Sequence, residues 1–239
     1  MARIRILRKR LFLLLTAILF TSVSLQAAEE DILPPQLPKE QRERLQKFLV
    51  DHSQPERFFP KNAKVVDSKS PVPIPDEKPV SAKSIKQYTV QIVQHRPTPD
   101  QPRVNKVDVL YYRPNPEKGK AGITVKYTVD LETGNQVGET EVLLKAHTPI
   151  SREETEEAVA LAKEKSPELK ALYANRDPKS IRWEYLQMMV TKKLDQVQVG
   201  DRVVRIVFTA APAQGESEAP PPLRVLVDLT RQLVIKDDR

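Results

Sequence analysis

Three histidines are the side chains best suited to metal binding or proton transfer in this 239-residue chain. His52, His95 and His147 fall in different segments, and none has a second histidine four residues away to place two ligands on one helical face. Cysteine is absent, which excludes disulfides, thiolate nucleophiles and cysteine-ligated zinc or iron–sulfur sites. We therefore predict surface or helix-flanking histidines, and no bound metal or cofactor.

Two aspartates recur in the same short context. Asp130 and Asp228 each stand in the tripeptide Val-Asp-Leu at the end of an alternating apolar segment. Two carboxylates that face each other across a cleft can perform acid–base chemistry. An aspartate at a strand end more commonly caps the following turn by accepting hydrogen bonds from backbone amides. We favour turn capping for both.

Four acids lie close together and could in principle attract calcium: Glu153, Glu154, Glu156 and Glu157. They stand directly after Ser151, and a serine followed three residues later by glutamate is the capping box that begins a helix. Negative charge is also favourable at the positive end of the helix dipole. The cluster therefore predicts a helix start with a solvated face.

One predicted strand is richer in large apolar side chains than the others. With a period of two, Trp183, Tyr185, Gln187 and Met189 share one face of the segment 181–190, and Met188 falls on the other. Such a strand is usually core, whereas exposed aromatic and methionine side chains would form a contact surface for a protein partner. We single out Trp183, Tyr185 and Met189 as possible partner contacts.

The segment Gln196 to Gly200 reads QVQVG and falls between two predicted strands. Cystatin inhibitors block papain-like proteases with a hairpin of the pattern Gln-x-Val-x-Gly. The middle valine is displaced by one residue here, and a one-residue slip in a strand turns side chains to the opposite face. Protease inhibition is kept as an alternative.

The elements that must position these residues are mixed helices and strands. A helix is predicted over 39–51 and another over 151–174, interrupted at Ser166-Pro167.

Proline-rich residues 60–81 predict an extended linker, with a proline-rich ligand for a partner as the alternative. Alternating apolar residues predict two runs of three strands; the segments are 87–94, 107–112, 123–129, 181–190, 202–210 and 223–235. Residues 137–145 could continue the first sheet.

The N-terminus has the order of an export signal. Five cations in the first ten residues precede the apolar run 11–23 and a small-residue exit at Ala27. The run is shorter than the roughly 20 residues that cross a bilayer as a helix. We predict a signal peptide over residues 1–27 and a secreted or periplasmic protein, with an uncleaved N-terminal membrane anchor as the alternative.

Charge gives no support to a nucleic-acid partner. The chain carries 39 basic and 32 acidic residues, but removal of residues 1–27 takes five bases with it and leaves a net charge of +2. Nucleic-acid-binding proteins usually show a clustered basic patch, which this sequence lacks. A membrane partner is expected only if the signal remains as an anchor.

The two halves of the chain read as copies. Residues 125–137 match residues 224–234 around the shared Val-Asp-Leu, each in the third strand of a run that follows a helix. Three antiparallel strands need a helix or another unit to bury their apolar face. We predict an α+β fold of two tandem helix-plus-three-strand antiparallel units, divided as residues 28–81 (helix and linker), 82–147 (first strand unit) and 148–239 (second unit).

The stretch 148–173, flanked by three-strand runs that end in Val-Asp-Leu, resembles the small N-terminal accessory domains of copper amine oxidases. The resemblance covers roughly residues 85–238 and implies cystatin-like α+β units placed in tandem. The resemblance assigns no catalytic residue to this chain. In copper amine oxidases the chemistry belongs to a separate large domain with three copper-binding histidines and a modified tyrosine.

The sequence lacks a glycine-rich phosphate loop and a G-x-S-x-G elbow, so it favours a non-catalytic protein over an enzyme. We expect an exported module that binds a protein or an envelope component. The alternative is a divergent enzyme, or an accessory subunit of an oxidase, that uses a pocket between helix and sheet.

Overall fold

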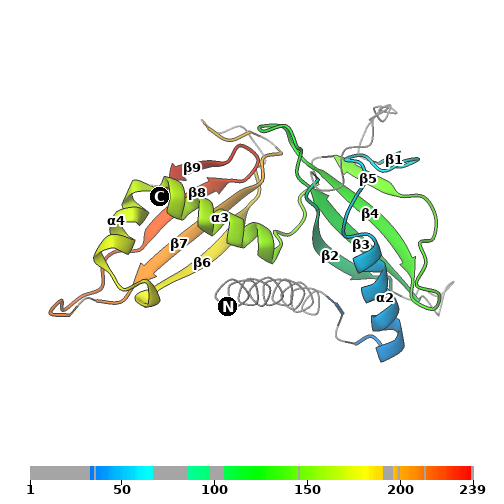
Figure 1. The fold of residues 1–239 in the computed structure, drawn as a ribbon, viewed down its shortest axis with the longest axis horizontal. Helices are drawn as coiled ribbons and strands as arrows, with labels where there is room; N and C mark the ends of the chain where they lie inside the picture. The colour runs from blue at the N-terminus through cyan, green and yellow to red at the C-terminus, as the bar shows by residue number, and fades with distance from the viewer. Residues whose placement is uncertain are drawn as a thin grey trace, which may run out of the picture.

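The computed structural model describes residues 33–34, 36–66, 85–96, 105–144, 146–190, 196–198, 200–212 and 214–237. The predicted α+β class is confirmed, with three α-helices and two sheets in this part of the chain. The sheets lie side by side, with α2 against the first sheet and α3 and α4 against the second (Figure 1). We call α2 with the first sheet the first unit, and α3 and α4 with the second sheet the second unit.

The first unit begins with helix α2 (Lys39–Asp51) and contains a sheet in the order β1-β5-β4-β3-β2. Strands β2 to β5 form an antiparallel meander, and β1 pairs with β5 in parallel. The strands are β1 (Lys64–Val65), β2 (Tyr88–Gln94), β3 (Lys106–Arg113), β4 (Ile123–Asp130) and β5 (Glu141–Leu144).

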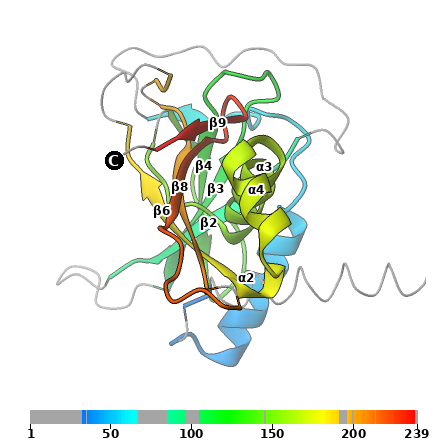
Figure 2. The same cartoon turned by 90° about the vertical axis from the view of Figure 1, so that its left-hand side faces the viewer.

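The second unit repeats the order of helix followed by meander. Its helices are α3 (Arg152–Lys165) and α4 (Pro167–Asn175), and its sheet runs β6-β7-β8-β9, antiparallel throughout. The strands are β6 (Ile181–Met188), β7 (Val203–Ala210), β8 (Leu223–Asp228) and β9 (Leu233–Lys236). Viewed from the side, α3 and α4 lie on one face of this sheet (Figure 2).

Each unit has its own core because each helix stripe meets one face of its own sheet. In the first unit, Leu45, Phe48 and Leu49 of α2 pack with the inward residues of β3 and β4. In the second, Ala158, Ala162 and Leu169 pack with the inward residues of β7 and β8. Burial of these apolar side chains is the main contribution to the stability of each unit.

The local signals at the long helix are confirmed. The Ser151 hydroxyl accepts from the Glu154 backbone amide at 3.1 Å, and a Glu154 carboxylate oxygen accepts from the Ser151 amide at 2.9 Å. Ser166 ends α3, and its hydroxyl caps α4, whose first residue is Pro167. The proline lacks a backbone donor, so it separates the two helices at this point.

Three details of the predicted elements are wrong. Each sheet has more strands than the predicted run of three. In the first sheet one of the additional strands is β5, which lies within the segment 137–145 that was expected to continue the sheet. The single strand predicted over 223–235 is two strands, β8 and β9, joined by a turn that begins at Asp228. The predicted linker over 60–81 contains β1, whose Val65 packs at the margin of the first core.

The predicted signal peptide over residues 1–27 and most of the proline-rich segment lie outside the described residues. Among the helices that the structure describes, none has the length and apolarity needed to cross a membrane. Export therefore remains a prediction from the sequence.

Candidate functional site

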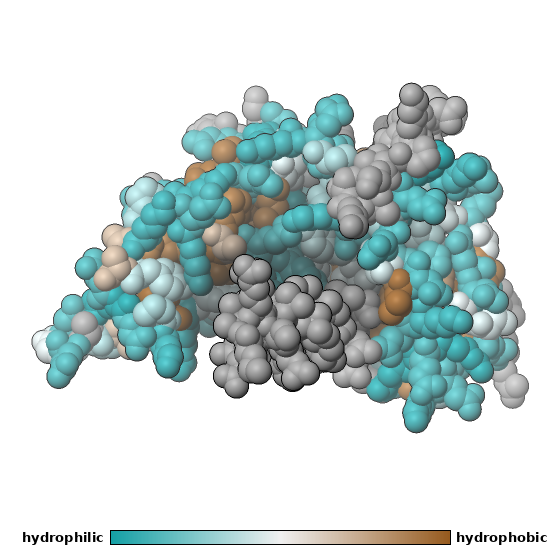
Figure 3. All heavy atoms as spheres, in the orientation of Figure 1, coloured by the Kyte–Doolittle hydropathy of each residue, from teal (hydrophilic) through white to brown (hydrophobic). Residues whose placement is uncertain are grey.

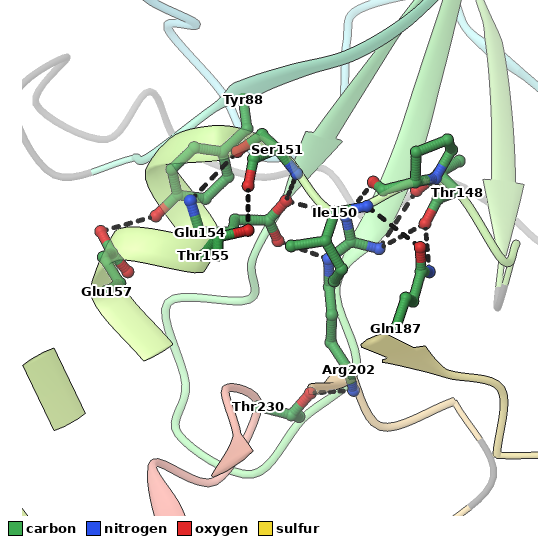
Figure 4. Close-up of polar contacts among 11 residues, drawn as sticks. Tyr88, Thr148, Ile150, Ser151, Glu154, Thr155, Glu157, Gln187, Arg202 and Thr230 are labelled. Atoms are coloured by element: carbon green, nitrogen blue, oxygen red, sulfur yellow. Dashed lines mark hydrogen bonds and ion pairs between the residues drawn. The ribbon is translucent and has the colours of Figure 1, made fainter. Parts of the chain in front are cut away.

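The two units are joined through a buried arginine. Arg202 lies just before β7 and is 7% exposed. Its guanidinium forms a two-bond ion pair with Glu154, which is 2% exposed, and its Nη1 donates to the Thr148 carbonyl oxygen at 3.0 Å (Figure 4). The same guanidinium lies 4.0 Å from the ring centre of Tyr112, which belongs to β3 of the first unit.

Further polar contacts cross the junction nearby. The Tyr88 hydroxyl donates to Glu157 at 2.8 Å, and the Lys86 ammonium pairs with the same carboxylate at 2.5 Å. The Gly119 amide donates to the Thr230 carbonyl oxygen at 3.1 Å. Chain segments around Tyr88, Gly119, Arg202 and Thr230 thus meet near the start of α3. The capping residue Glu154 is also the counter-ion of Arg202 there.

A cavity of about 240 Å³ opens at this junction. It is the feature that best fits the alternative of a catalytic pocket, because polar groups from both units line it. Burial raises the pKa of Tyr112 to about 12, and burial followed by repulsion from Glu157 raises the pKa of Tyr88 still further. Both phenols therefore stay protonated near neutral pH. The Tyr88 hydroxyl donates to Glu157, whereas the Tyr112 oxygen accepts from the Gly122 backbone amide.

The carboxylates of the cavity are already engaged. Glu154 is held by Arg202, and Glu157 by Lys86 and Tyr88. A general acid or base must be able to exchange a proton with a bound reactant. The ion pairs of Glu154 and Glu157 hold this junction together. For a catalytic pocket, the cavity therefore provides space, but neither carboxylate is free to act as an acid or a base.

The repeated aspartates cap turns, as predicted. Asp130 Oδ1 accepts from the backbone amides of Glu132 and Thr133 at 2.8 and 3.0 Å, and Asp228 Oδ1 accepts from the Arg231 amide at 3.1 Å. They lie in the corresponding turns of different sheets and do not form a catalytic pair.

Asp228 differs from Asp130 in its burial. Its side chain is fully buried, while Asp130 is partly exposed. Burial, with repulsion from Asp201, raises the pKa of Asp228 to about 6 despite the backbone bonds and Arg231, which favour the charged form. Arg231 lies 3.2 Å from Asp201 and 3.8 Å from Asp228, so it serves both carboxylates.

The histidines stay apart from one another. His52 stacks on Phe48 at the end of α2, His95 lies 2.9 Å from an Asp108 oxygen, and His147 is exposed in the segment between the two units. In the described part of the chain, no group of three or more histidine, aspartate or glutamate side chains could hold a metal ion. Of the acid cluster, Glu154 and Glu157 are used by the junction.

The aromatic strand β6 is exposed, not core. Trp183 is 37% exposed, Tyr185 48% and Met189, just after the strand, 61%; Leu186, on the other face, is 58% exposed. Trp183 lies opposite Phe208 of β7, and Tyr185 lies opposite Ile206, so both share the face on which the helices pack. Helix α3 packs mainly on β7, β8 and β9, which leaves Trp183 and Tyr185 of β6 uncovered.

Hydrophobic residues are visible around α3 on this side of the second unit (Figure 3). β6 is also an edge strand, since β7 is its only pairing partner among the described strands. Its backbone groups on the outer side therefore add a hydrogen-bonding edge to the exposed aromatic surface. We call Trp183, Tyr185, Leu186 and Met189, together with this edge, the β6 surface.

The segment that resembles the protease-blocking hairpin lies between β6 and β7, as expected. Val197 is 3% exposed and packs with Val190 and Val203 in a small cluster on the far face of the sheet. A valine buried in its own sheet is not available to enter a protease cleft. The described residues of this segment give protease inhibition no support.

No protein-family model matches the sequence, and no curated protein matches it significantly.

Proposed function

We propose that the chain is an exported, non-catalytic module that binds a protein through the β6 surface. The observation that carries this proposal is the exposure of Trp183 and Tyr185 on an edge strand that no other described element covers. Tryptophan and tyrosine are enriched among the residues that dominate binding energy at protein interfaces. The edge adds backbone donors and acceptors that an extended partner segment can pair with.

The proposal includes two tandem cystatin-like units. Its support is the repeated order of helix and antiparallel meander, with α2 and α3 each packed on the sheet that follows. The turns after Asp130 and Asp228 recur at the same place, between the third and fourth strands of each meander. This arrangement agrees with the resemblance to amine oxidase accessory domains, and it supports the proposal of a scaffold that presents a binding surface.

The second candidate is an accessory subunit of an oxidase, or a divergent enzyme, that uses the junction cavity. Its specific support is the cavity of about 240 Å³, lined by Tyr88, Tyr112 and Lys118 among others. We rank it second because the two carboxylates of the cavity are held in ion pairs.

Capture from an envelope extract tests the leading proposal. The immobilised protein is compared with the double variant Trp183→Ser/Tyr185→Ser, which removes the aromatic side chains and leaves the strand able to form. We expect at least a tenfold loss of captured partner, since the variant removes two residues of the kind that make binding hot spots.

A matched variant, Val50→Ser/Val93→Ser, removes exposed apolar side chains from the first unit instead, where Val50 is 54% and Val93 40% exposed. It should capture the partner as well as the wild type does. Equal capture by all three proteins would contradict the proposal, and loss only in the first-unit variant would place the contact elsewhere.

A further inference from the structure

β6 differs from the other edge strands of the described sheets in being neither short nor interrupted by a register shift. β1 and β9 span only two and four residues, and β2 has a register shift between Thr89 and Gln91. β6 pairs with β7 over all eight of its residues, Ile181–Met188, with no register shift and no proline. Natural edge strands are usually short, bulged or interrupted by proline, because an open regular edge pairs with other strands.

The charged residues of β6 are arranged to complement their own copy. Arg182 and Glu184 are two residues apart on the face opposite Trp183, both are exposed, and neither forms an ion pair with another described residue. In an antiparallel pair of two identical strands, a two-fold axis through Trp183 places Arg182 of each copy opposite Glu184 of the other. Opposite charges directly across two strands attract, and like charges repel.

The neighbouring registers are worse. An axis through Glu184 would set that carboxylate against its own copy, which is destabilising. An axis through Tyr185 would set Glu184 against Leu186 and Arg182 against Met188, and both charges would lose a counter-ion. Only the register centred on Trp183 satisfies both charges, and it places the two Trp183 side chains directly opposite each other on the helix-bearing face.

We infer that the partner of the β6 surface is a second copy of this chain, joined edge to edge by antiparallel pairing of β6 in the register centred on Trp183. The pairing makes one continuous eight-stranded sheet from two four-stranded ones. The interface is the same patch on both copies, as two-fold symmetry requires. The inference rests on the proposed function, since it names the partner of that same surface.

Charge reversal with rescue tests the register. Arg182→Glu creates two like-charge contacts, and Glu184→Arg creates two of the opposite sign. The double variant Arg182→Glu/Glu184→Arg exchanges the charges and restores both attractive pairs in the same register. Sedimentation velocity of the purified protein over a concentration series measures the dimer dissociation constant of each form.

We expect a wild-type dimer, a dissociation constant raised about tenfold or more in each single variant, and recovery in the double variant. At a protein concentration low enough for every form to be monomeric, all three variants should keep the wild-type melting temperature, because the altered side chains are exposed in the monomer. A wild-type protein that stays monomeric, or a double variant no better than the single ones, would overturn the inference.

The outcome separates this inference from the proposed function. A monomeric wild type whose envelope partner is lost in Trp183→Ser/Tyr185→Ser would mean that β6 binds a different protein. That result rejects self-pairing and leaves the proposed function in place. A wild type that stays monomeric, together with capture that is unaffected by the aromatic substitutions, would reject both.

Discussion

Replacing Arg202 by methionine should lower the free energy of unfolding by about 3–5 kcal/mol. Methionine keeps the length of the side chain, but it leaves the Glu154 carboxylate buried without its counter-ion, at 2% exposure. It also removes the donors to the carbonyl oxygens of Thr148 and Pro149. Urea denaturation followed by circular dichroism measures the change.

Two controls isolate the buried charge. Arg152→Met removes an exposed arginine from the ion pair with Glu156 and should change stability by less than about 1 kcal/mol. Adding Glu154→Gln to Arg202→Met removes the orphaned charge while keeping a side-chain oxygen for the helix cap, and it should recover part of the loss. An effect of Arg202→Met no larger than that of Arg152→Met would show that the junction does not depend on this pair.

Replacing Asp228 by asparagine should make the protein more stable at neutral pH and remove part of its pH dependence. The pKa of Asp228 is raised from 3.8 to about 6 in the folded protein, so the folded state binds the proton more tightly than the unfolded chain does. The resulting stabilisation is fully present below pH 4 and is lost as the pH rises through about 6. Above that pH, the charged carboxylate costs on the order of 3 kcal/mol relative to the protonated form.

Asparagine retains an oxygen in the place of Oδ1, so it can still accept from the Arg231 amide, and Arg231 keeps Asp201 as a counter-ion. The free energies of unfolding of wild type and variant should converge near pH 4 and differ most above pH 7. Asp130→Asn, at the corresponding turn of the first unit, is the matched control and should show no comparable gain between pH 4 and 7. A variant that is less stable than wild type at pH 7 would contradict the assigned role of burial.

The sequence predicted helix ends and turns correctly where they depend on hydrogen bonds between residues that are close in the chain. The capping box of Ser151 and Glu154 and the break at Pro167 are decided by hydrogen bonds within a few residues, and both are confirmed. The turns at Asp130 and Asp228 were predicted for the same reason. Strand number was less well predicted, because β9 and β1 are short and are defined by their pairing partners and not by their own pattern.

The exposure of β6 could not be read from its alternation. Trp183 and Phe208 lie opposite each other on one face of the sheet, yet Phe208 is 1% exposed and Trp183 37%. The difference depends on where α3 lies across the sheet, which is a tertiary property. Periodicity therefore identified the face of Trp183 and left open whether that face was core or surface.

The Arg202–Glu154 pair was missed altogether. Glu154 was recognised as a cap, which accounts for only one of its two roles. Arg202 stands at the start of an alternating segment, where an arginine is ordinarily a solvated strand end. The pairing joins residues separated by 48 positions, and no spacing rule connects them.

The central claim is that β6 is an open surface that becomes covered when the protein binds its partner. Trp183 is the only tryptophan of the chain, so 5-fluorotryptophan labelling gives one fluorine NMR resonance from the middle of this surface. In the free monomer a soluble nitroxide should broaden that resonance, and in the complex, whether with a second copy or another protein, the resonance should shift and be protected. A resonance that is already protected in the monomer, or one that stays equally accessible in the complex, would contradict the claim.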